Sequence, residues 1–482
     1  MAQPAVNLNT LDGQLGILPA QSGRPLAIVG VSSAGPAVNT PVAYGRVSSI
    51  KSALVSGPLA HAAAHHVALT GKPVVVVRTG STVAGAFGTV DNSNVTGDAD
   101  FSADSGTEPD DDYEIVIRVV AGGTVGVAGI TYQTSQDGGR NYGAVTALGT
   151  ATNIVIPNTG GAAFDVTTDT LVAGDYMLCR TTAPQWNDAE LTSALTALKN
   201  SGYDFEIVHV VGAVDADAFD VVHTALSGMA AVGKFCSAVC NTRVPNVGED
   251  EATYKAALDT LYSAKASTYI EMCAGACEIS SSLTGLKHLR PYSFDCASDE
   301  ANVAEHIDIA DPSRESRAVG IRDENGNPKH HDETVNPGLQ DSRFSVLRTF
   351  NGVAGVYPNR PQLFSAEGSD FDLHAHRRVF NIALRVLSIY FLKRLNKPVR
   401  VDKNTGYILE AEAVEIENGA NGVLAAALKA TPKASDVTFT LSRTDNVLSS
   451  KTLTGDCSIT PLAYPETFNI GVGFKNPALT AI

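Results

Sequence analysis

Short runs of aliphatic residues recur along this 482-residue chain, and they constrain its fold more than any other feature. Three of them are PLAIVGVSSAG (25–35), PVVVVRTG (73–80) and DFEIVHVVG (204–212). A strand that is apolar at almost every position needs cover on both faces, as in a parallel sheet. Between the first two runs, residues 46–70 space their apolar side chains as helices do. This alternation predicts an α/β fold with a parallel or mixed sheet core covered by helices.

The stretch 91–170 differs from the rest of the chain in composition and in the spacing of its apolar residues. Gly, Asp, Ser and Thr dominate it, and its strand-like runs at 113–120, 126–134 and 152–157 are short. Turn signals such as the DGG at 137–139 separate these runs, and no helical spacing intervenes. The stretch therefore predicts an all-β insertion domain.

The C-terminal third begins with strands and continues with the longest amphipathic pattern of the chain, at 372–396, followed by a second helical pattern at 407–430. This order predicts an α+β domain. The resulting division of the chain is an N-terminal arm at 1–23, an α/β domain at 24–90 plus 171–345, a β-rich insertion at 91–170, a C-terminal α+β domain at 346–465 and a C-terminal arm strand at 466–482.

The charge balance and the lack of long apolar runs exclude several classes of partner. The chain carries 51 acidic and 35 basic residues, a formal net charge of −16, which repels phosphate backbones. We therefore expect no direct nucleic-acid binding. No stretch approaches the roughly 18 apolar residues that a membrane helix needs, and the N-terminus lacks the features of a signal peptide. We expect synthesis in the cytoplasm and no membrane insertion.

Motifs that carry catalytic or cofactor chemistry are incomplete. Residues 80–85 have the glycine spacing of a P-loop, but Ala86 and Phe87 stand where Lys and Ser or Thr would hold phosphate and Mg²⁺. His61 and His65 lie four residues apart on a predicted helix, without the glutamate of an HExxH zinc motif. The seven cysteines form no CxxC pair. We therefore expect no catalytic residue, cofactor or metal site, and a protein that is not an enzyme.

The order of these pieces resembles that of contractile tail sheath proteins, from myovirus-type phages and related contractile injection systems. The opening of that family, a strand, a Gly-Pro loop and a helix, is similar to PLAIVGVSSAGPAVNTPVAYGRVSSIKSAL (25–54). Its next helix and apolar strand are similar to GPLAHAAAHHVALTGKPVVVVRTG (57–80). Its C-terminal domain resembles RTFNGVAGVYPNRPQLFSAEGSDFDLHAHRRVFNIALRVLSIYFLKRLN (348–396) and the following TGYILEAEAVEIENGANGVLAAALKA (405–430). The weight of the resemblance lies in the order of several pieces and covers most of the chain.

The resemblance implies a structural subunit of a contractile tail sheath, which polymerises helically around the tail tube and contracts to drive the tube through the host envelope. Its expected partners are further copies of itself, the tail tube protein, and the baseplate and tail terminator proteins. Its expected place is the virion tail, after assembly in the cytoplasm of a bacterial host. The alternatives are another structural particle protein, such as a tube, capsid or adhesin subunit, or an enzyme on an α/β scaffold.

Sheath subunits of this kind are linked by terminal arms that add strands to a neighbour's sheet, a form of β-augmentation. The last segment alternates apolar and polar residues and has no partner strand after it in the sequence. The candidate residues of this inter-subunit arm strand are Phe468, Ile470, Val472 and Phe474.

Basic residues on the long helical pattern suggest a partner surface. Arg377 and Arg378 place positive charge near the start of the helix, where the helix dipole disfavours it. With Arg385 they form a candidate basic face toward an acidic surface of the tube or of a neighbouring subunit.

The odd number of cysteines suggests covalent links between subunits. A thiol that has no partner in its own chain can pair with another copy in the oxidising surroundings of a released particle. The candidates for such inter-subunit disulfides are Cys457, Cys296 and Cys179.

Overall fold

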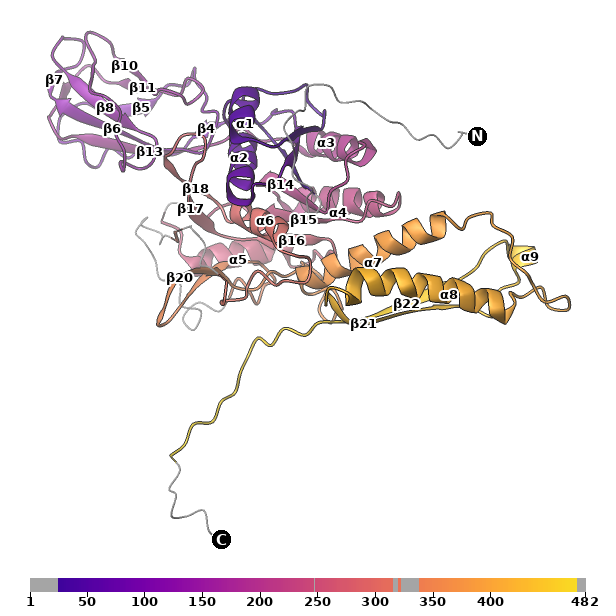
Figure 1. Cartoon of the computed structure of the whole chain (residues 1–482). Helices are drawn as coiled ribbons and strands as arrows, with labels where there is room; N and C mark the ends of the chain where they lie inside the picture. The colour runs from indigo at the N-terminus through magenta and orange to yellow at the C-terminus, as the bar shows by residue number, and fades with distance from the viewer. Residues whose placement is uncertain (1–24, 247, 315–319, 322–337, 475–482) are drawn as a thin grey trace. The chain divides into compact units, whose positions relative to one another are not determined.

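The computed structural model describes residues 25–246, 248–314, 320–321 and 338–474 (Figure 1). The chain divides into two compact units, Met1–Asn381 and Ile382–Ile482, and the division falls within the long helix α7 (His374–Leu392). The first unit holds a six-stranded sheet with its helices and the β-rich insertion. Across the described ranges, no helix is long and apolar enough to cross a membrane.

The central sheet has the strand order β16-β15-β14-β1-β3-β2. Its strands are β1 (Leu26–Gly30), β2 (Val42–Tyr44), β3 (Val74–Arg78), β14 (Ile207–Ala213), β15 (Ser237–Asn241) and β16 (Ile270–Cys273). All pair in parallel except β2, which runs antiparallel to β3. All residues of β1 are buried, because β1 has a strand on each side and helices on both faces. The mixed α/β core predicted from the aliphatic runs is confirmed.

Helices cover both faces of the sheet. One face carries α3 (Asp188–Asn200), α4 (Ala216–Ala230) and α5 (Glu251–Tyr262), and the other carries α1 (Val47–Leu54), α2 (Pro58–Thr70) and α6 (Ser293–Asn302). Successive residues of a strand point to opposite faces, so Ala27 and Val29 pack in the first layer and Leu26 and Ile28 in the second.

The insertion lies between β3 and α3 and builds its own apolar core. Its strands are β4 (Ala86–Phe87), β5 (Phe101–Ala103), β6 (Glu114–Ala121), β7 (Gly123–Thr124), β8 (Thr131–Ser135), β9 (Thr146–Ala147), β10 (Asn153–Val155), β11 (Ala163–Val166), β12 (Thr170–Leu171) and β13 (Tyr176–Thr182). The predicted bounds 91–170 are too narrow, because β13 pairs antiparallel with β6 and β4 inside this domain. The apolar run of β13 has the same pattern as a strand of the central sheet, so the sequence pattern alone assigned β13 to the α/β domain.

A buried ion pair fastens the insertion to the α/β body. Arg290 lies on β18 (Lys287–Pro291), which forms a hairpin with β17 (Ala276–Ser280). Its guanidinium donates two hydrogen bonds to the Asp111 carboxylate, at 2.6 and 2.5 Å. The His61 Nε2 atom lies 3.1 Å from the same carboxylate.

Three buried histidines predict that the first unit loses stability in acid. Burial lowers the pKa of His61, His66 and His209 to about 3, well below the ordinary value of a histidine. Below about pH 6.5 the unfolded chain therefore binds protons that the folded chain does not, and stability falls by up to about 1.4 kcal/mol per pH unit for each histidine.

We expect the free energy of unfolding, measured by urea denaturation, to fall between pH 6.5 and 4.5. The His66 Nδ1 atom has no hydrogen-bond partner in the described structure, and its Nε2 atom makes one long contact, 3.5 Å from Thr70 Oγ1, so His66→Leu removes a titrating group with the loss of one weak hydrogen bond. The variant should show a shallower pH dependence than the natural chain. An equal slope in both proteins would contradict the assignment of His66 as a buried neutral imidazole.

Residues 344–364 belong to the α/β body and not to a C-terminal domain. Ser345 and Leu363 form bridges with Cys273 and Glu271 of β16, and between them lies the hairpin of β19 (Leu347–Phe350) and β20 (Val353–Pro358). The predicted boundary at 346 is therefore too early, because the chain on both sides of this two-stranded sheet pairs with β16, the edge strand of the central sheet.

The second unit is a small α+β body. Its elements are the end of α7, α8 (Glu410–Leu424) with a π-helical turn η1 (Ala425–Lys429), β21 (Ala434–Leu441), α9 (Val447–Ser450) and β22 (Gly455–Pro461), drawn from orange to yellow in Figure 1. The two helices predicted at 372–396 and 407–430 are confirmed. β21 buries Ala434, Val437, Phe439 and Leu441 on one face.

Candidate functional site

The strand β22 presents an open edge. It pairs antiparallel with β21 in a two-stranded sheet, and within the described residues it pairs with no other strand. Most of its residues are exposed. The free N–H and C=O groups of such an edge form a template for one more strand.

The opposite edge of this sheet is closed by side chains of α8. The Asn421 amide accepts a hydrogen bond from the Phe439 N–H at 2.7 Å and donates one to the Phe439 carbonyl at 3.0 Å. The Glu417 carboxylate accepts from the Leu441 N–H at 2.6 Å. These bonds occupy backbone groups of Phe439 and Leu441 in β21, so these groups are not free to pair with an added strand.

The segment after β22 carries the predicted arm residues. Phe468, Ile470, Val472 and Phe474 are each at least 74% exposed. Residues 462–474 form neither helix nor strand in the single chain. Four large apolar side chains in alternation on an uncovered segment have the pattern of a strand that lacks its sheet. The other predicted arm, 1–23, lies outside the described residues.

The second unit contains a groove of about 970 Å³ whose lining includes Gly455, the first residue of β22. Its walls combine apolar side chains, such as Phe391, Leu395 and Leu448, with charged ones, such as Arg394 and Glu412. The apolar part of these walls provides a place where side chains of an added strand could be buried.

A second candidate site is a buried set of charged side chains where α6 and the start of α7 meet the central sheet. The Arg378 guanidinium donates to Glu206 Oε1 at 2.8 Å and to Glu300 Oε2 at 3.0 Å. Burial raises the pKa of Glu300 to about 7. Burial opposes protonation of His374, but the carboxylates of Glu300 and Glu271 outweigh it and raise its pKa.

One chain of hydrogen bonds in this set has the order of a nucleophilic triad. The His374 Nε2 atom lies 2.7 Å from Ser237 Oγ, and its Nδ1 atom lies 2.5 Å from Glu271 Oε2. A catalytic serine must reach a substrate carbonyl. All three side chains are 0% exposed, so the arrangement connects β15, β16 and α7 inside the body and presents no nucleophile at the surface.

Comparison with known sequences assigns the chain to a family. A family model described as DUF2586, N-terminal domain, matches residues 3–360. The chain belongs to the DUF2586 family. No curated protein matches its sequence.

Solved structures identify the fold of this DUF2586 protein. The sheath complex of an extracellular contractile injection system, called PVC and solved in its contracted state, is 10% identical over 99% of both chains, with a TM-score of 0.53. A sheath tail protein from Listeria innocua is 14% identical and covers 92% of this chain and 96% of its own, with a TM-score of 0.43. A sheath tail protein from Desulfitobacterium hafniense is 11% identical over 95% and 100%, with a TM-score of 0.44. The likeness to the first shows that the DUF2586 protein has the fold of a contractile sheath protein, and the predicted resemblance is confirmed.

The basic face expected on α7 of the DUF2586 protein does not exist at its surface. Arg377, Arg378 and Arg385 are each at most 7% exposed. Arg378 is neutralised by the buried carboxylates described above, and the Arg377 guanidinium lies over the Tyr269 ring at 4.2 Å. The prediction of a partner-facing role is therefore wrong: interior groups far away in the sequence compensate the positive charge at the helix start.

The three cysteines predicted to form inter-subunit disulfides differ in accessibility. Cys179 and Cys296 are 3% and 0% exposed, so they cannot meet a thiol of another copy without unfolding, and the prediction is wrong for both. Cys457 lies on β22 and is partly exposed, and partial burial raises its pKa. A link through Cys457 stays a prediction.

Thiol labelling tests this assignment. Six of the seven cysteines are buried, so we expect a maleimide to modify one thiol quickly in the folded DUF2586 chain and all seven in urea. Cys457→Ser should abolish the fast reaction, as counted by mass spectrometry. A second fast thiol in that variant would contradict the burial of the other six.

Proposed function

We propose that this chain is the structural subunit of a contractile sheath, which polymerises helically around a tail tube and contracts to drive the tube through the host envelope. One observation carries the proposal: β22 offers an open edge, and the same chain carries an alternating apolar segment that has no sheet. The open edge of one copy and the free segment of another are complementary. The sheath fold agrees with this role.

The joint between subunits would be a strand added to β22. Backbone hydrogen bonds would supply its directionality, and the groove lined by Phe391, Leu395 and Leu448 would receive apolar side chains of the added segment. Because the arm is a single strand, each body keeps rotational freedom about the joint. Contraction is then a rigid-body rearrangement from one packing of the polymer to another, and it needs no nucleotide.

The role is structural and not catalytic, and it implies specific partners. These are further copies of the chain, the tail tube protein, and the baseplate and tail terminator proteins. The finished particle would be a virion tail assembled in the cytoplasm of a bacterial host. The net charge of −16 disfavours direct contact with nucleic acid.

Electron microscopy of the purified full-length chain tests the proposal. At rising protein concentration we expect wide hollow tubes or stacked rings built from helically arranged subunits. Discrete globular particles at every concentration, with or without tube protein added, would contradict the proposal. Closed shells or narrow solid fibres would favour a different structural role.

A further inference from the structure

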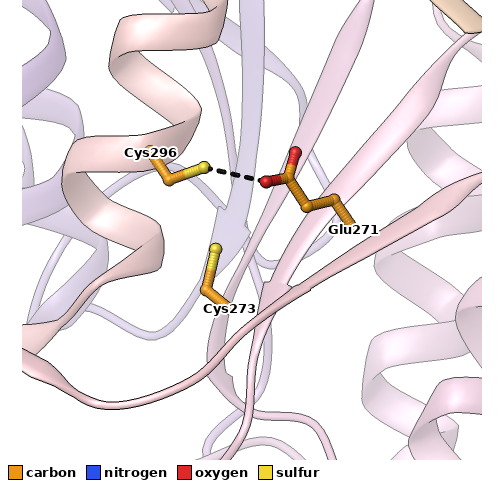
Figure 2. A group of neighbouring side chains, drawn as sticks. All are labelled: Glu271, Cys273 and Cys296. Carbon is orange, nitrogen blue, oxygen red and sulfur yellow. Dashed lines mark hydrogen bonds between the residues drawn. The ribbon is translucent and has the colours of Figure 1, made fainter. Parts of the chain in front are cut away.

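Two thiols and a carboxylate converge in the interior of the α/β body. Cys273 and Glu271 come from β16 and Cys296 from α6, and Figure 2 shows the two sulfur atoms and the carboxylate pointing toward a common point. The Cys296 Sγ atom lies 3.3 Å from Glu271 Oε1, and the three donor atoms all lie within 4.8 Å of one another. All three residues are buried.

The donor types and their spacing suit one particular ion. Around a tetrahedral Zn²⁺, with Zn–S near 2.3 Å and Zn–O near 2.1 Å, neighbouring ligand atoms are separated by roughly 3.6–3.8 Å. Thiolate sulfur selects zinc or a similar soft cation over Mg²⁺ and Ca²⁺. The geometry of the three side chains therefore needs only small adjustments to hold zinc.

Further ligands lie next to the cluster. Glu300 and His374 have donor atoms that lie within 4.8 Å of each other and of the Glu271 carboxylate. The hydrogen bond between His374 Nε2 and Ser237 fixes the orientation of the imidazole ring, as outer partners do for metal-bound histidines.

We propose that Cys273, Cys296 and Glu271 bind one structural Zn²⁺ ion, with His374 or Glu300 as the fourth ligand. On binding, the two thiols release two protons and become thiolates, so the two lost positive charges equal the charge of the ion. His374 would serve as the fourth ligand only after its Nδ1 atom has also released the proton that it donates to Glu271. The ion would fasten β16 to α6, and its binding free energy would add to the stability of the body.

No metal site could be predicted from the sequence, because metal-binding motifs are recognised by ligands that lie close together along the chain. Cys273 and Cys296 lie far apart along the chain and belong to no CxxC motif. Only the fold brings the end of β16 against α6.

Metal analysis of the purified full-length chain tests the proposal. After incubation with ZnSO₄ and gel filtration, we expect about one zinc per chain, held in a closed site that weak chelators do not strip. The double variant Cys273→Ser, Cys296→Ser should bind none. Cys236→Ser is the matched control, a buried cysteine next to the same sheet whose Sγ contacts Met229, and it should bind as the natural chain does.

Cobalt provides a readout that does not depend on a folded variant. Co²⁺ bound by the natural chain should give the intense near-ultraviolet absorption of thiolate-to-cobalt charge transfer, and added Zn²⁺ should abolish it. The proposal would be overturned if the natural chain bound no zinc after the incubation, or if it bound metal and its cobalt form lacked these absorption bands. A disulfide between Cys273 and Cys296 in place of the metal would also overturn it. None of these outcomes depends on polymerisation, so they are distinct from a failure of the sheath proposal.

Discussion

Arg378→Ala should destabilise the first unit by about 3–5 kcal/mol, because removing one partner of a buried ion pair leaves an uncompensated buried charge. Glu206 and Glu300 would lose the guanidinium that lies between them at 2.8 and 3.0 Å. The protein contains a single tryptophan, Trp186, which is buried and donates its indole N–H to the Val211 carbonyl at 2.8 Å. Its fluorescence during urea denaturation therefore reports on the unit that contains Arg378.

The matched control is Arg180→Ala. Arg180 pairs with Glu114 at 3.2 Å in the same unit, but its side chain is 34% exposed, so its loss should change stability by less than about 1 kcal/mol. The comparison also separates two roles for Arg378. If Arg378→Ala had the same free energy of unfolding as the natural chain but failed to assemble, Arg378 would contact a partner, and its role inside the body would be contradicted.

The strands and helices of the fold could be predicted from the local spacing of apolar residues, but the elements against which they pack or pair could not. The aliphatic run at 73–80 became β3, and the amphipathic pattern at 372–396 became α7. The run at 176–182 also became a strand, yet it belongs to the insertion. An apolar run indicates that a strand is buried, but it does not indicate to which sheet the strand belongs.

The same distinction between local and distant contacts decides which features of the candidate sites could be predicted. The exposed arm residues Phe468 to Phe474 could be predicted, because alternation within one segment is a local property. The burial of Arg378 could not, because Glu206 and Glu300 are distant in the sequence. Nor could the closure of the β21 edge by Asn421 and Glu417, since polar residues on a helix give no signal that they face a strand.

These features together suggest how rigidity and mobility are distributed. Ion pairs and hydrogen bonds such as Arg290–Asp111 and Ser237–His374 cross from one element to another inside the first unit. Broken or half-satisfied networks of this kind are costly, so the body resists internal deformation. In the segment after β22, the arm residues Phe468, Ile470, Val472 and Phe474 are each at least 74% exposed. A polymer that changes its packing without unfolding needs this combination of stiff bodies and pliable joints.

The largest effect is expected from changing the arm itself. Phe468, Ile470, Val472 and Phe474 are exposed in the single chain, so replacing all four with serine should leave the folded monomer and its unfolding midpoint unchanged. Burial of large apolar side chains contributes about 1.5–3 kcal/mol each, so their loss should remove several kcal/mol from every joint. Since each 1.4 kcal/mol is about tenfold in a binding constant, polymers should disappear at concentrations where the natural chain forms them.

The alternation supplies the control for that experiment. Asn469, Gly471 and Gly473 occupy the intervening positions and would face away from the groove in an added strand. Serine at these three positions should leave polymerisation intact, as judged by sedimentation and electron microscopy of both variants beside the natural chain. Equal loss of polymer in both variants would mean that the segment acts without a strand-like alternation of faces. Cohesive tubes from the four-serine variant would mean that the arm does not join the subunits, and the open edge of β22 would then need a different partner.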